Sequence, residues 1–168
     1  MAQRTAWRRT LWPMRAVVQR VSRAEVRVEG RVTGSIAGGL CVLLAVGPGD
    51  SAETADHLAE RIATLRVFGD AAAKMNLDIS ASKGSVLVVS QFTLYADSSR
   101  GHRPSFVGAA APALAAELCE VFVEALRKRG LRVATGEFGA HMELEVVGDG
   151  PVTIVLSYDE PPWEADAG

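Results

Sequence analysis

The sequence predicts a single α+β domain, in which a curved, barrel-like sheet of mixed or largely antiparallel strands packs against two main helices. Three observations support this fold class. About eight short runs have the length and pattern of strands, whereas only two segments, near 52–65 and 112–129, have helical spacing. Two helices are too few, and too unevenly placed, for a doubly wound parallel sheet. At 168 residues, 48% of them hydrophobic, the chain is long enough to bury one core.

The first third of the chain predicts four strands, at residues 15–21, 25–28, 31–36 and 40–46. The second and third of these form a hairpin that turns at Glu29-Gly30. We expect three valines to share one face of this hairpin: Val26, Val28 and Val32. The fourth run, LCVLLAV, is apolar throughout, which is typical of a central strand.

A helix follows the turn at residues 48–51, where Asp50 or Ser51 can cap its first turn. Its apolar side chains recur at helical spacing, at Ala55, Leu58, Ala59, Ile62 and Leu65. This face is therefore expected to lie on the sheet. The next segments are a short strand at 66–68, a loop-like stretch at 69–82 and a buried strand at 86–89.

The second helix spans residues 112–129 and ends before Gly130. Its apolar stripe comprises Leu114, Leu118, Val121, Phe122, Ala125 and Leu126. The basic run at 127–129 suits the negative C-terminal end of a helix, so we interpret it as a structural feature. Three further strands complete the domain, at 131–134, 142–147 and 152–158, with a tight interruption at 148–151.

The formal net charge of −2 excludes a uniformly basic protein that coats nucleic acid. The charge is unevenly distributed: residues 1–13 carry +3, residues 159–168 carry −4, and the body between them carries −1. A polyanionic partner must therefore be held by a local patch. We predict a flexible N-terminal extension at 1–13, one domain at 14–158 and a disordered acidic tail at 159–168.

The composition indicates a cytoplasmic protein. No apolar run approaches the ~20 residues of a membrane helix, and no apolar region follows the N-terminal arginines as it does in a signal peptide. Cys41 and Cys119 each lie in an apolar segment, as buried and reduced thiols do. The three histidines are far apart and fit no metal-ligand spacing, so we predict no metal and no cofactor.

Polar side chains gather where the strand at 86–89 leaves the core, at Ser90, Gln91 and Thr93. Binding and catalytic groups often lie on loops that a rigid strand holds in place. Two interpretations stay open from the residue types: a functional site, or a strand end whose hydroxyls only cap the backbone.

A turn-rich loop follows, and it carries a basic trio, Arg100, His102 and Arg103. This trio is either a contact for an anionic ligand or a solvated turn. A triad of Ser90, His102 and Asp97 can be written, but nothing in the spacing supports it.

The other unusual element is Pro151, inside the run VVGDGPVTIVL. Proline removes a ladder donor from a sheet, so it marks an edge, a bulge or a turn. Because few X-Pro bonds in folded proteins are cis, the residues alone predict a trans Gly150-Pro151 bond in a plain β-turn.

These two elements together resemble the paired signature motifs of D-aminoacyl-tRNA deacylases, as SQFTL at 90–94 and GDGPVT at 148–153. The run MRAVVQRVSRAEVRVEGRVTGSIAGGLCVLLAVG is similar to the N-terminal region of that family, starting at Met14. RVFGDAAAKMNLDI, SVLVVSQFTLYAD and RGHRPSF also match in order and spacing. The resemblance covers residues 14–157, and the motif pair at this separation is specific.

The resemblance implies a homodimeric, metal-independent esterase. Its substrate would be the ester that joins a D-amino acid, or glycine, to the terminal adenosine of tRNA. In the family the Gly-Pro bond is cis and is inserted into the active site of the partner subunit. Gly150 and Pro151 would present their carbonyl oxygens to the α-amino group of the substrate, and the side chain of an L-amino acid would run into them. Thr153 closes the same motif.

The resemblance also implies a set of roles at the strand end. Backbone N–H groups near Gln91 and Phe92 would form an oxyanion hole, a device typically worth ~10²–10³ in rate for each donor. Ser90 and Gln91 would hold the pocket. Thr93 is either the nucleophile, or it has no catalytic role and the adenosine 2′-hydroxyl provides the activation. We favour the second, because no base to activate Thr93 is evident in the sequence.

One position departs from the family pattern, which has Asn where this chain has Gly148. A glycine cannot supply the side-chain hydrogen bond that Asn would give the loop, so other contacts must hold it. Arg100, His102 and Arg103 are the residues we expect to contact tRNA phosphates, which position the RNA without reading its sequence.

Two alternatives differ in kind. The first is a stand-alone editing domain like that of archaeal threonyl-tRNA synthetases, which the absence of a synthetase body disfavours. The second is a non-catalytic RNA-binding module that uses the basic loop. The body charge of −1 and the lack of an aromatic stacking platform argue against the module.

Overall fold

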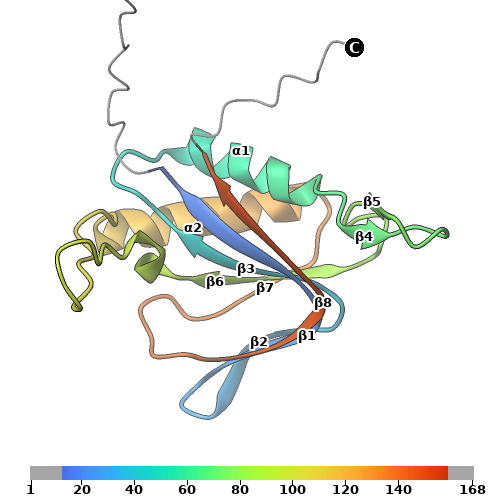
Figure 1. Ribbon diagram of the computed structural model, residues 1–168, viewed down its shortest axis with the longest axis horizontal. Coiled ribbons are helices and arrows are strands. Elements are labelled where there is room, and N and C mark those ends of the chain that lie inside the picture. Colours follow the sequence, from blue (N-terminus) through green and yellow to red (C-terminus); the bar gives the residue numbers. More distant parts are fainter. Residues whose placement is uncertain (1–12, 159–168) are drawn as a thin grey trace, which may run out of the picture.

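The computed structural model describes residues 13–158, which form two helices packed on one face of a strongly bent sheet (Figure 1). The extension and the acidic tail predicted from the sequence lie almost wholly outside these residues. No helix of the described part is both long and apolar enough to cross a membrane. The predicted fold class, α+β with a barrel-like mixed sheet and two helices, is confirmed.

The sheet is organised around one long strand, β1 (Arg15–Val28). Its first half pairs antiparallel with β3 (Gly39–Ala45), and its second half pairs with β2 (Arg31–Ile36). The opposite edge of β1 is covered along most of its length by β8 (Glu143–Ser157). Two pairs of strands that the sequence predicted separately are therefore single, bent strands, and the interruption at 148–151 is a bend within β8.

Parallel strands extend the sheet on the other side of β3. β6 (Ser85–Ser90) pairs with β3, and β7 (Val133–Thr135) pairs with β6. The far end of the sheet then curls back until β2 meets β7. A Cβ on Gly34 would lie 2.4 Å from the carbonyl oxygen of Thr135, so only glycine permits this close approach. The sheet is thereby almost closed into a barrel.

The helices cover one face of the sheet and pack on each other (Figure 1). Helix α1 (Ala52–Ala63) begins at Ser51, whose hydroxyl accepts from the Thr54 N–H while the Thr54 hydroxyl accepts from the Ser51 N–H. The helix ends before Leu65, the last residue of the predicted apolar stripe, which lies half-buried just after the helix. Helix α2 (Pro112–Lys128) begins with proline in its first turn, where a missing N–H costs nothing.

Besides the core between the helices and the sheet, a separate apolar cluster fills the inside of the curled sheet. Its buried members are Val21, Ala24, Val26, Ile36, Cys41, Leu87 and Val89. The hairpin turn at Glu29-Gly30 is confirmed, with positive φ at both residues. The prediction that Val32 shares the buried face is wrong, because a bulge between Val26 and Arg27 shifts the register and leaves Val32 exposed.

Two short elements were also missed or misplaced. The segment 69–82 contains β5 (Met75–Leu77), which pairs with β4 (Phe68–Gly69) in a small hairpin outside the main sheet. A 3₁₀ helix, η1 (Phe92–Tyr95), follows β6 where the sequence predicted only a polar strand end. Both are too short for a periodic pattern to reveal them.

Candidate active site

The strand end after β6 is held rigidly. The Gln91 N–H donates to the Leu44 carbonyl at 2.7 Å, which ties the start of η1 to β3. The Tyr95 ring is buried, and its hydroxyl donates to the carbonyl of Pro13. Arg15 donates to the Leu94 carbonyl at 3.1 Å, and its guanidinium lies 4.9 Å from the centre of the Tyr95 ring. Hydrogen bonds at Gln91, Leu94 and Tyr95 thus hold η1 in place after Ser90.

A cavity of about 340 Å³ opens beside this strand end. Its walls come from β3, β6, η1, the loop before α2, α2 itself and the loop before β8. The lining residues are mostly apolar: Leu44, Ala45, Val46, Ser90, Gln91, Phe92, Phe106, Ala109, Ala110, Pro112, Ala115, Cys119, Phe138 and Gly139. The rings of Phe92 and Phe106 meet edge to face with centroids 5.2 Å apart. A flat aromatic or heterocyclic ligand suits such walls.

The structure brings Ser90, Gln91 and Phe92 together as walls of this cavity. Thr93 lies next to them, and its hydroxyl accepts a hydrogen bond from the side-chain amide of Gln91. One expected role is wrong: the Gln91 N–H is not free to bind an oxyanion, because the Leu44 carbonyl accepts it. The Phe92 N–H, in the first turn of η1, has no partner within that helix and remains the candidate donor.

The basic trio lies on an exposed loop beside the cavity. The base of the loop is closed by two backbone hydrogen bonds between Asp97 and Ser105, each 2.8 Å long. Hydrogen bonds from the side chain and the backbone N–H of Ser99 lower the pKa of the Asp97 carboxyl. Arg100, His102 and Arg103 are all exposed.

The alternative triad finds no support in this geometry. Asp97 is engaged by Ser99, and His102 points into solvent on the loop. Within residues 13–158, no hydrogen bond joins Ser90, His102 and Asp97.

The second motif lies elsewhere. The Gly150-Pro151 bond is cis, and both residues are exposed at the bend of β8. Gly148 pairs with Val21, which in turn pairs with Gly39, the first residue of β3. Ser90 instead pairs with Leu44, near the last residue of β3. The two motifs therefore lie at opposite ends of the same sheet, and one chain does not bring them together.

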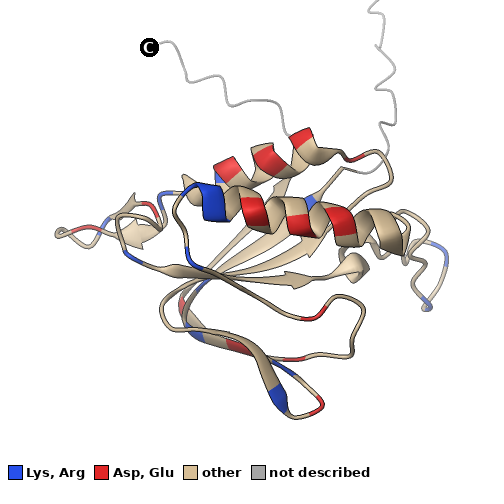
Figure 2. Cartoon of the chain, turned by 180° about the vertical axis from the view of Figure 1, so that it is seen from behind, with Lys and Arg blue, Asp and Glu red and all other residues tan. Residues whose placement is uncertain are grey.

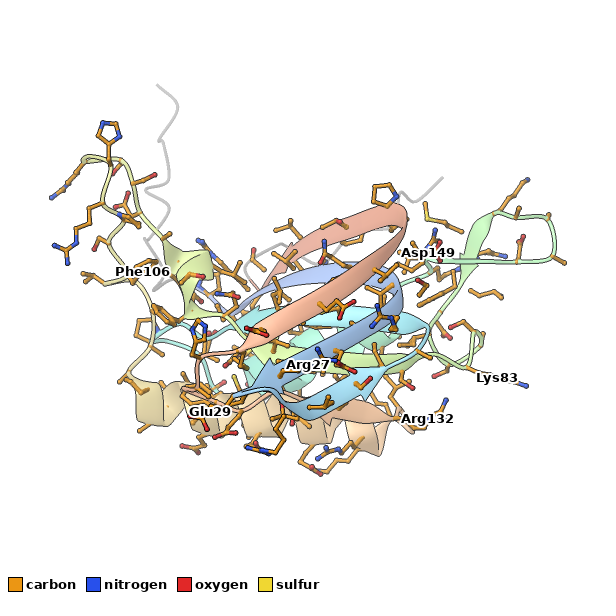
Figure 3. All side chains as sticks on the ribbon, turned by 90° about the horizontal axis from the view of Figure 1, so that it is seen from below. Arg27, Glu29, Lys83, Phe106, Arg132 and Asp149 are labelled. Carbon is orange, nitrogen blue, oxygen red and sulfur yellow. The ribbon has the colours of Figure 1, made fainter. Side chains whose placement is uncertain are left out.

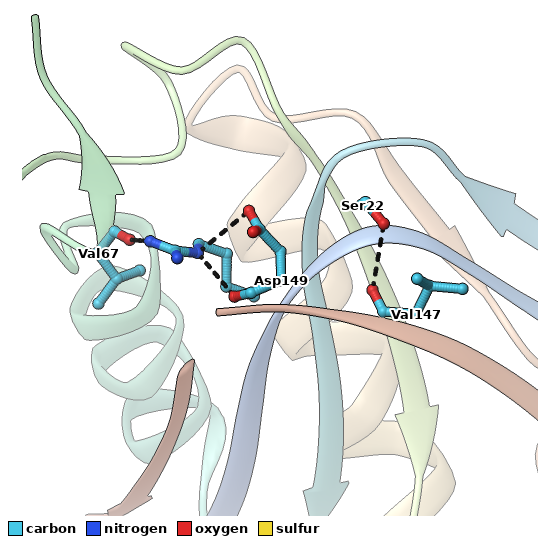
Figure 4. A network of polar contacts seen from close by, with 5 residues as sticks. Ser22, Val67, Val147 and Asp149 are labelled. Carbon is cyan, nitrogen blue, oxygen red and sulfur yellow. Dashed lines mark hydrogen bonds and ion pairs between the residues drawn. The ribbon is translucent and has the colours of Figure 1, made fainter. Parts of the chain in front are cut away.

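The bend of β8 is held by an arginine that sequence reasoning missed (Figure 4). Arg20 donates to the backbone carbonyl of Asp149 at 3.1 Å and to the carbonyl of Val67 at 2.6 Å. Farther along, the Ser22 hydroxyl lies 3.5 Å from the carbonyl of Val147. Gly148 offers no side chain, so these contacts from Arg20 and Ser22 hold the bend. Thr153 pairs with Gln19 in the ladder and is exposed.

Phe138 and Cys119 are further wall residues that the sequence did not assign to the site; Cys119 was expected only as a buried thiol. Neither carries a local motif; each reaches the cavity only through the packing of its own element. Burial, with a smaller contribution from Glu120, raises the pKa of the Cys119 thiol to about 11. The thiol is therefore neutral and behaves as an apolar wall. In the described chain, no group of three or more His, Cys, Asp or Glu side chains could hold a metal ion.

Comparison with known proteins places both motifs inside one family match. A family model described as D-Tyr-tRNA(Tyr) deacylase matches residues 17–157. A D-aminoacyl-tRNA deacylase of Deinococcus radiodurans is 57% identical over 143 residues, which cover 85% of this chain and 99% of that protein. One of Anaeromyxobacter dehalogenans is also 57% identical over 143 residues, covering 85% and 96%.

Two solved structures share the fold. A c-Myc DNA unwinding element binding protein is 38% identical with a TM-score of 0.80, covering 85% of this chain and 97% of that one. A probable eukaryotic D-amino acid tRNA deacylase has a TM-score of 0.77 at 17% identity, covering 86% and 98%, which is a likeness of fold.

Proposed function

The chain belongs to the D-Tyr-tRNA(Tyr) deacylase family, and we propose that it hydrolyses the ester bond of D-aminoacyl-tRNA, releasing the free D-amino acid and tRNA. The observation that carries this proposal is the placement of the two motifs. One forms the wall of a cavity, and the other is an exposed, braced bend at the opposite end of the sheet. Neither alone makes a site that can tell D from L.

We place the terminal adenosine and its aminoacyl ester in the cavity beside Ser90. Its volume of about 340 Å³ lies within the ~300–1,000 Å³ of small-molecule sites. Phe92, Phe106 and Phe138 supply apolar and aromatic surface for a nucleoside. The few polar groups, on Ser90 and Gln91, lie together at one wall, which is where the ester would be oriented.

The second motif would complete the site from a partner copy. In this proposal the protein is a homodimer, and Gly150 and Pro151 of one subunit enter the cavity of the other. The exposure of this dipeptide supports the idea, as does Val155 on the same strand, a residue that is 68% exposed. An exposed apolar residue on an edge strand such as β8, which pairs only with β1 among the described strands, suits an interface between subunits.

Selectivity would then be steric. The dipeptide leaves room for hydrogen at the position where an L-amino acid carries its side chain, so L-aminoacyl esters are rejected. Glycine carries no side chain that the dipeptide could exclude. Glycyl-tRNA mischarged on tRNA(Ala) is therefore a second expected substrate.

The chemistry asks little of the side chains, because an aminoacyl ester is already activated. The Phe92 N–H would stabilise the oxyanion, and the 2′-hydroxyl of the adenosine would assist the attacking water. Gln91 would fix Thr93, whose hydroxyl already accepts from it. An amide is not a base, so this contact does not activate Thr93 as a nucleophile. The basic loop with Arg100, His102 and Arg103 would contact phosphates of the acceptor end.

The test is the release of labelled tyrosine from D-Tyr-tRNA and L-Tyr-tRNA, each with and without a chelator. We expect fast release from D-Tyr-tRNA, little from L-Tyr-tRNA, and no effect of the chelator. Glycyl-tRNA(Ala) should also be hydrolysed. Equal release of both enantiomers would contradict the chiral mechanism. Tight tRNA binding without hydrolysis would support a non-catalytic RNA-binding module instead.

A further inference from the structure

Besides the mostly apolar cavity, a separate and polar cleft lies where β6 begins, at the opposite end of that strand from Ser90. It has a volume of about 200 Å³. The residues that line it are Ser80, Lys83, Gly84, Gly130, Leu131 and Arg132. Lys83 and Arg132 are both exposed, and the Arg132 guanidinium donates to the Lys83 carbonyl at 3.3 Å, which holds the two chain segments together. The cleft therefore presents two cations on a fixed backbone.

The surroundings favour an anion in this cleft. None of its lining residues is acidic. Asp78 lies nearby in the sequence but does not line the cleft, and its carboxylate accepts from the Ala81 N–H at 2.9 Å. Acidic residues recur along the helices α1 and α2, and basic residues are found in the loops at both ends of the molecule, as well as at the end of α2 and on the lower hairpin (Figure 2). A polyanion is thus repelled from the helix face and attracted to the ends.

One basic end is the loop beside the cavity, and the other holds this cleft. The cleft shares its end of the sheet with the β8 bend: Gly148, Val21, Gly39 and Ser85 are successive partners across four strands. At about 4.8 Å per strand, three spacings separate Ser85 from Gly148 by roughly 14 Å. Figure 3 shows Lys83, Arg132 and Asp149 toward one end of the molecule and Phe106 toward the other.

We propose that the Lys83–Arg132 cleft binds a backbone phosphate of the tRNA whose 3′ end occupies the cavity of the partner subunit. The inference rests on the proposed function and its dimer. If Gly150 and Pro151 enter the partner's cavity, the cleft is carried to within a few nucleotides of the bound ester. Each substrate is then gripped by cations of both subunits: the loop at 100–103 of one and the cleft of the other.

The first test removes the two charges while keeping side-chain length, in Lys83→Gln with Arg132→Gln. We expect the KM for D-Tyr-tRNA to rise on the order of tenfold with kcat retained, and the slope of log KM against log salt to fall by about 1 for each phosphate that the variant no longer binds. The matched control, Lys74→Gln with Lys128→Gln, removes two exposed lysines outside the cleft and should keep the wild-type slope.

Equal effects in the two double variants, or no effect in the first, would overturn the proposal. These outcomes are separate from a failure of the proposed function, in which the unaltered protein would not hydrolyse D-Tyr-tRNA at all. Thermal unfolding of both variants checks that the fold is intact.

A second test asks which subunit supplies the cleft. A mixed dimer is purified with two affinity tags: one chain carries Lys83→Gln and Arg132→Gln, and the other carries Ala109→Trp, which fills its cavity. The only unfilled cavity is then that of the Lys83→Gln, Arg132→Gln chain, and its partner has an intact cleft. The KM should therefore return to the wild-type value. A KM as high as that of the charge-depleted homodimer would show that the cleft acts on its own subunit's substrate, and would overturn the proposal.

Discussion

Arg20 binds both the backbone and the side chain of Asp149: its Nε donates to the Asp149 carbonyl at 3.1 Å and lies 3.4 Å from the carboxylate. The opposite side of the same guanidinium donates to Val67 at 2.6 Å (Figure 4). The Arg20 side chain is only 15% exposed. The β8 bend is thereby tied both to β1 and to the residue before β4, and it cannot shift without breaking hydrogen bonds of a largely buried guanidinium.

Replacing Arg20 with Ala should therefore loosen the dipeptide more than the fold. We expect a loss of about 1–3 kcal/mol in stability, because two carbonyls lose a charged donor. Discrimination between D-Tyr-tRNA and L-Tyr-tRNA should fall at the same time, with L-Tyr-tRNA hydrolysis rising. The control is Asp149→Asn, which keeps the carbonyl acceptor and should retain selectivity. Unchanged selectivity in Arg20→Ala would remove this role.

The two glycines of the bend should respond oppositely to a side chain. Gly150 has φ +126°, and its Cβ would lie 2.9 Å from a Val152 methyl group and 3.1 Å from Arg20. Gly150→Ala should cost about 1–3 kcal/mol and impair selectivity, because an L-residue is strained there. Gly148 has open space, so Gly148→Asn should be tolerated and leave activity intact. Thermal melts and D/L assays measure both, and equal damage at the two positions would contradict this account.

Thr93→Ala should retain near-normal turnover of D-Tyr-tRNA. The hydroxyl accepts from the Gln91 amide, and no described side chain that could act as a base hydrogen-bonds to it. Single-turnover rates with tRNA ending in adenosine or 2′-deoxyadenosine give the comparison. The deoxy substrate should be slow with both proteins. Complete loss of activity in a folded Thr93→Ala protein would instead make Thr93 the nucleophile.

If the proposed dimer forms, Val155→Glu should convert it to monomers and abolish activity, because a charge would be placed on the exposed apolar strand. Light scattering gives the mass, and the deacylation assay gives the activity. Val32→Glu is the matched control on β2, at a valine that is 47% exposed, and it should stay dimeric and active. An active Val155→Glu monomer would show that the site needs no partner.

Cys119 should react slowly with alkylating reagents although it lines the cavity. Burial raises its pKa to about 11, so the reactive thiolate is scarce at neutral pH. Its alkylation rate should climb tenfold per pH unit from pH 7 to 9.5. Burial also raises the pKa of Cys41 to about 11, so stability should decline above about pH 9, where unfolded thiols ionise and the folded ones do not. An alkylation rate of Cys119 that levels off near pH 8.5 would indicate an ordinary, solvated thiol.

The sequence by itself determined most of the elements and the residues of both motifs. Helical spacing at Leu58 and Ile62, and the apolar runs of β3 and β6, report local burial, which a periodic pattern records directly. Ser90 ends such a strand and Gln91 and Phe92 follow it, so their place on a cavity wall could be foreseen.

The tertiary structure alone decided how these parts meet. The bulge that exposes Val32, the grip of Arg20 on Asp149 and the arrival of Phe138 at the cavity all depend on pairing between segments distant in sequence. So does the separation of Ser90 from Gly150 by the length of β3. Strand register is a long-range property, set by which residues pair across the sheet, and no local pattern encodes it.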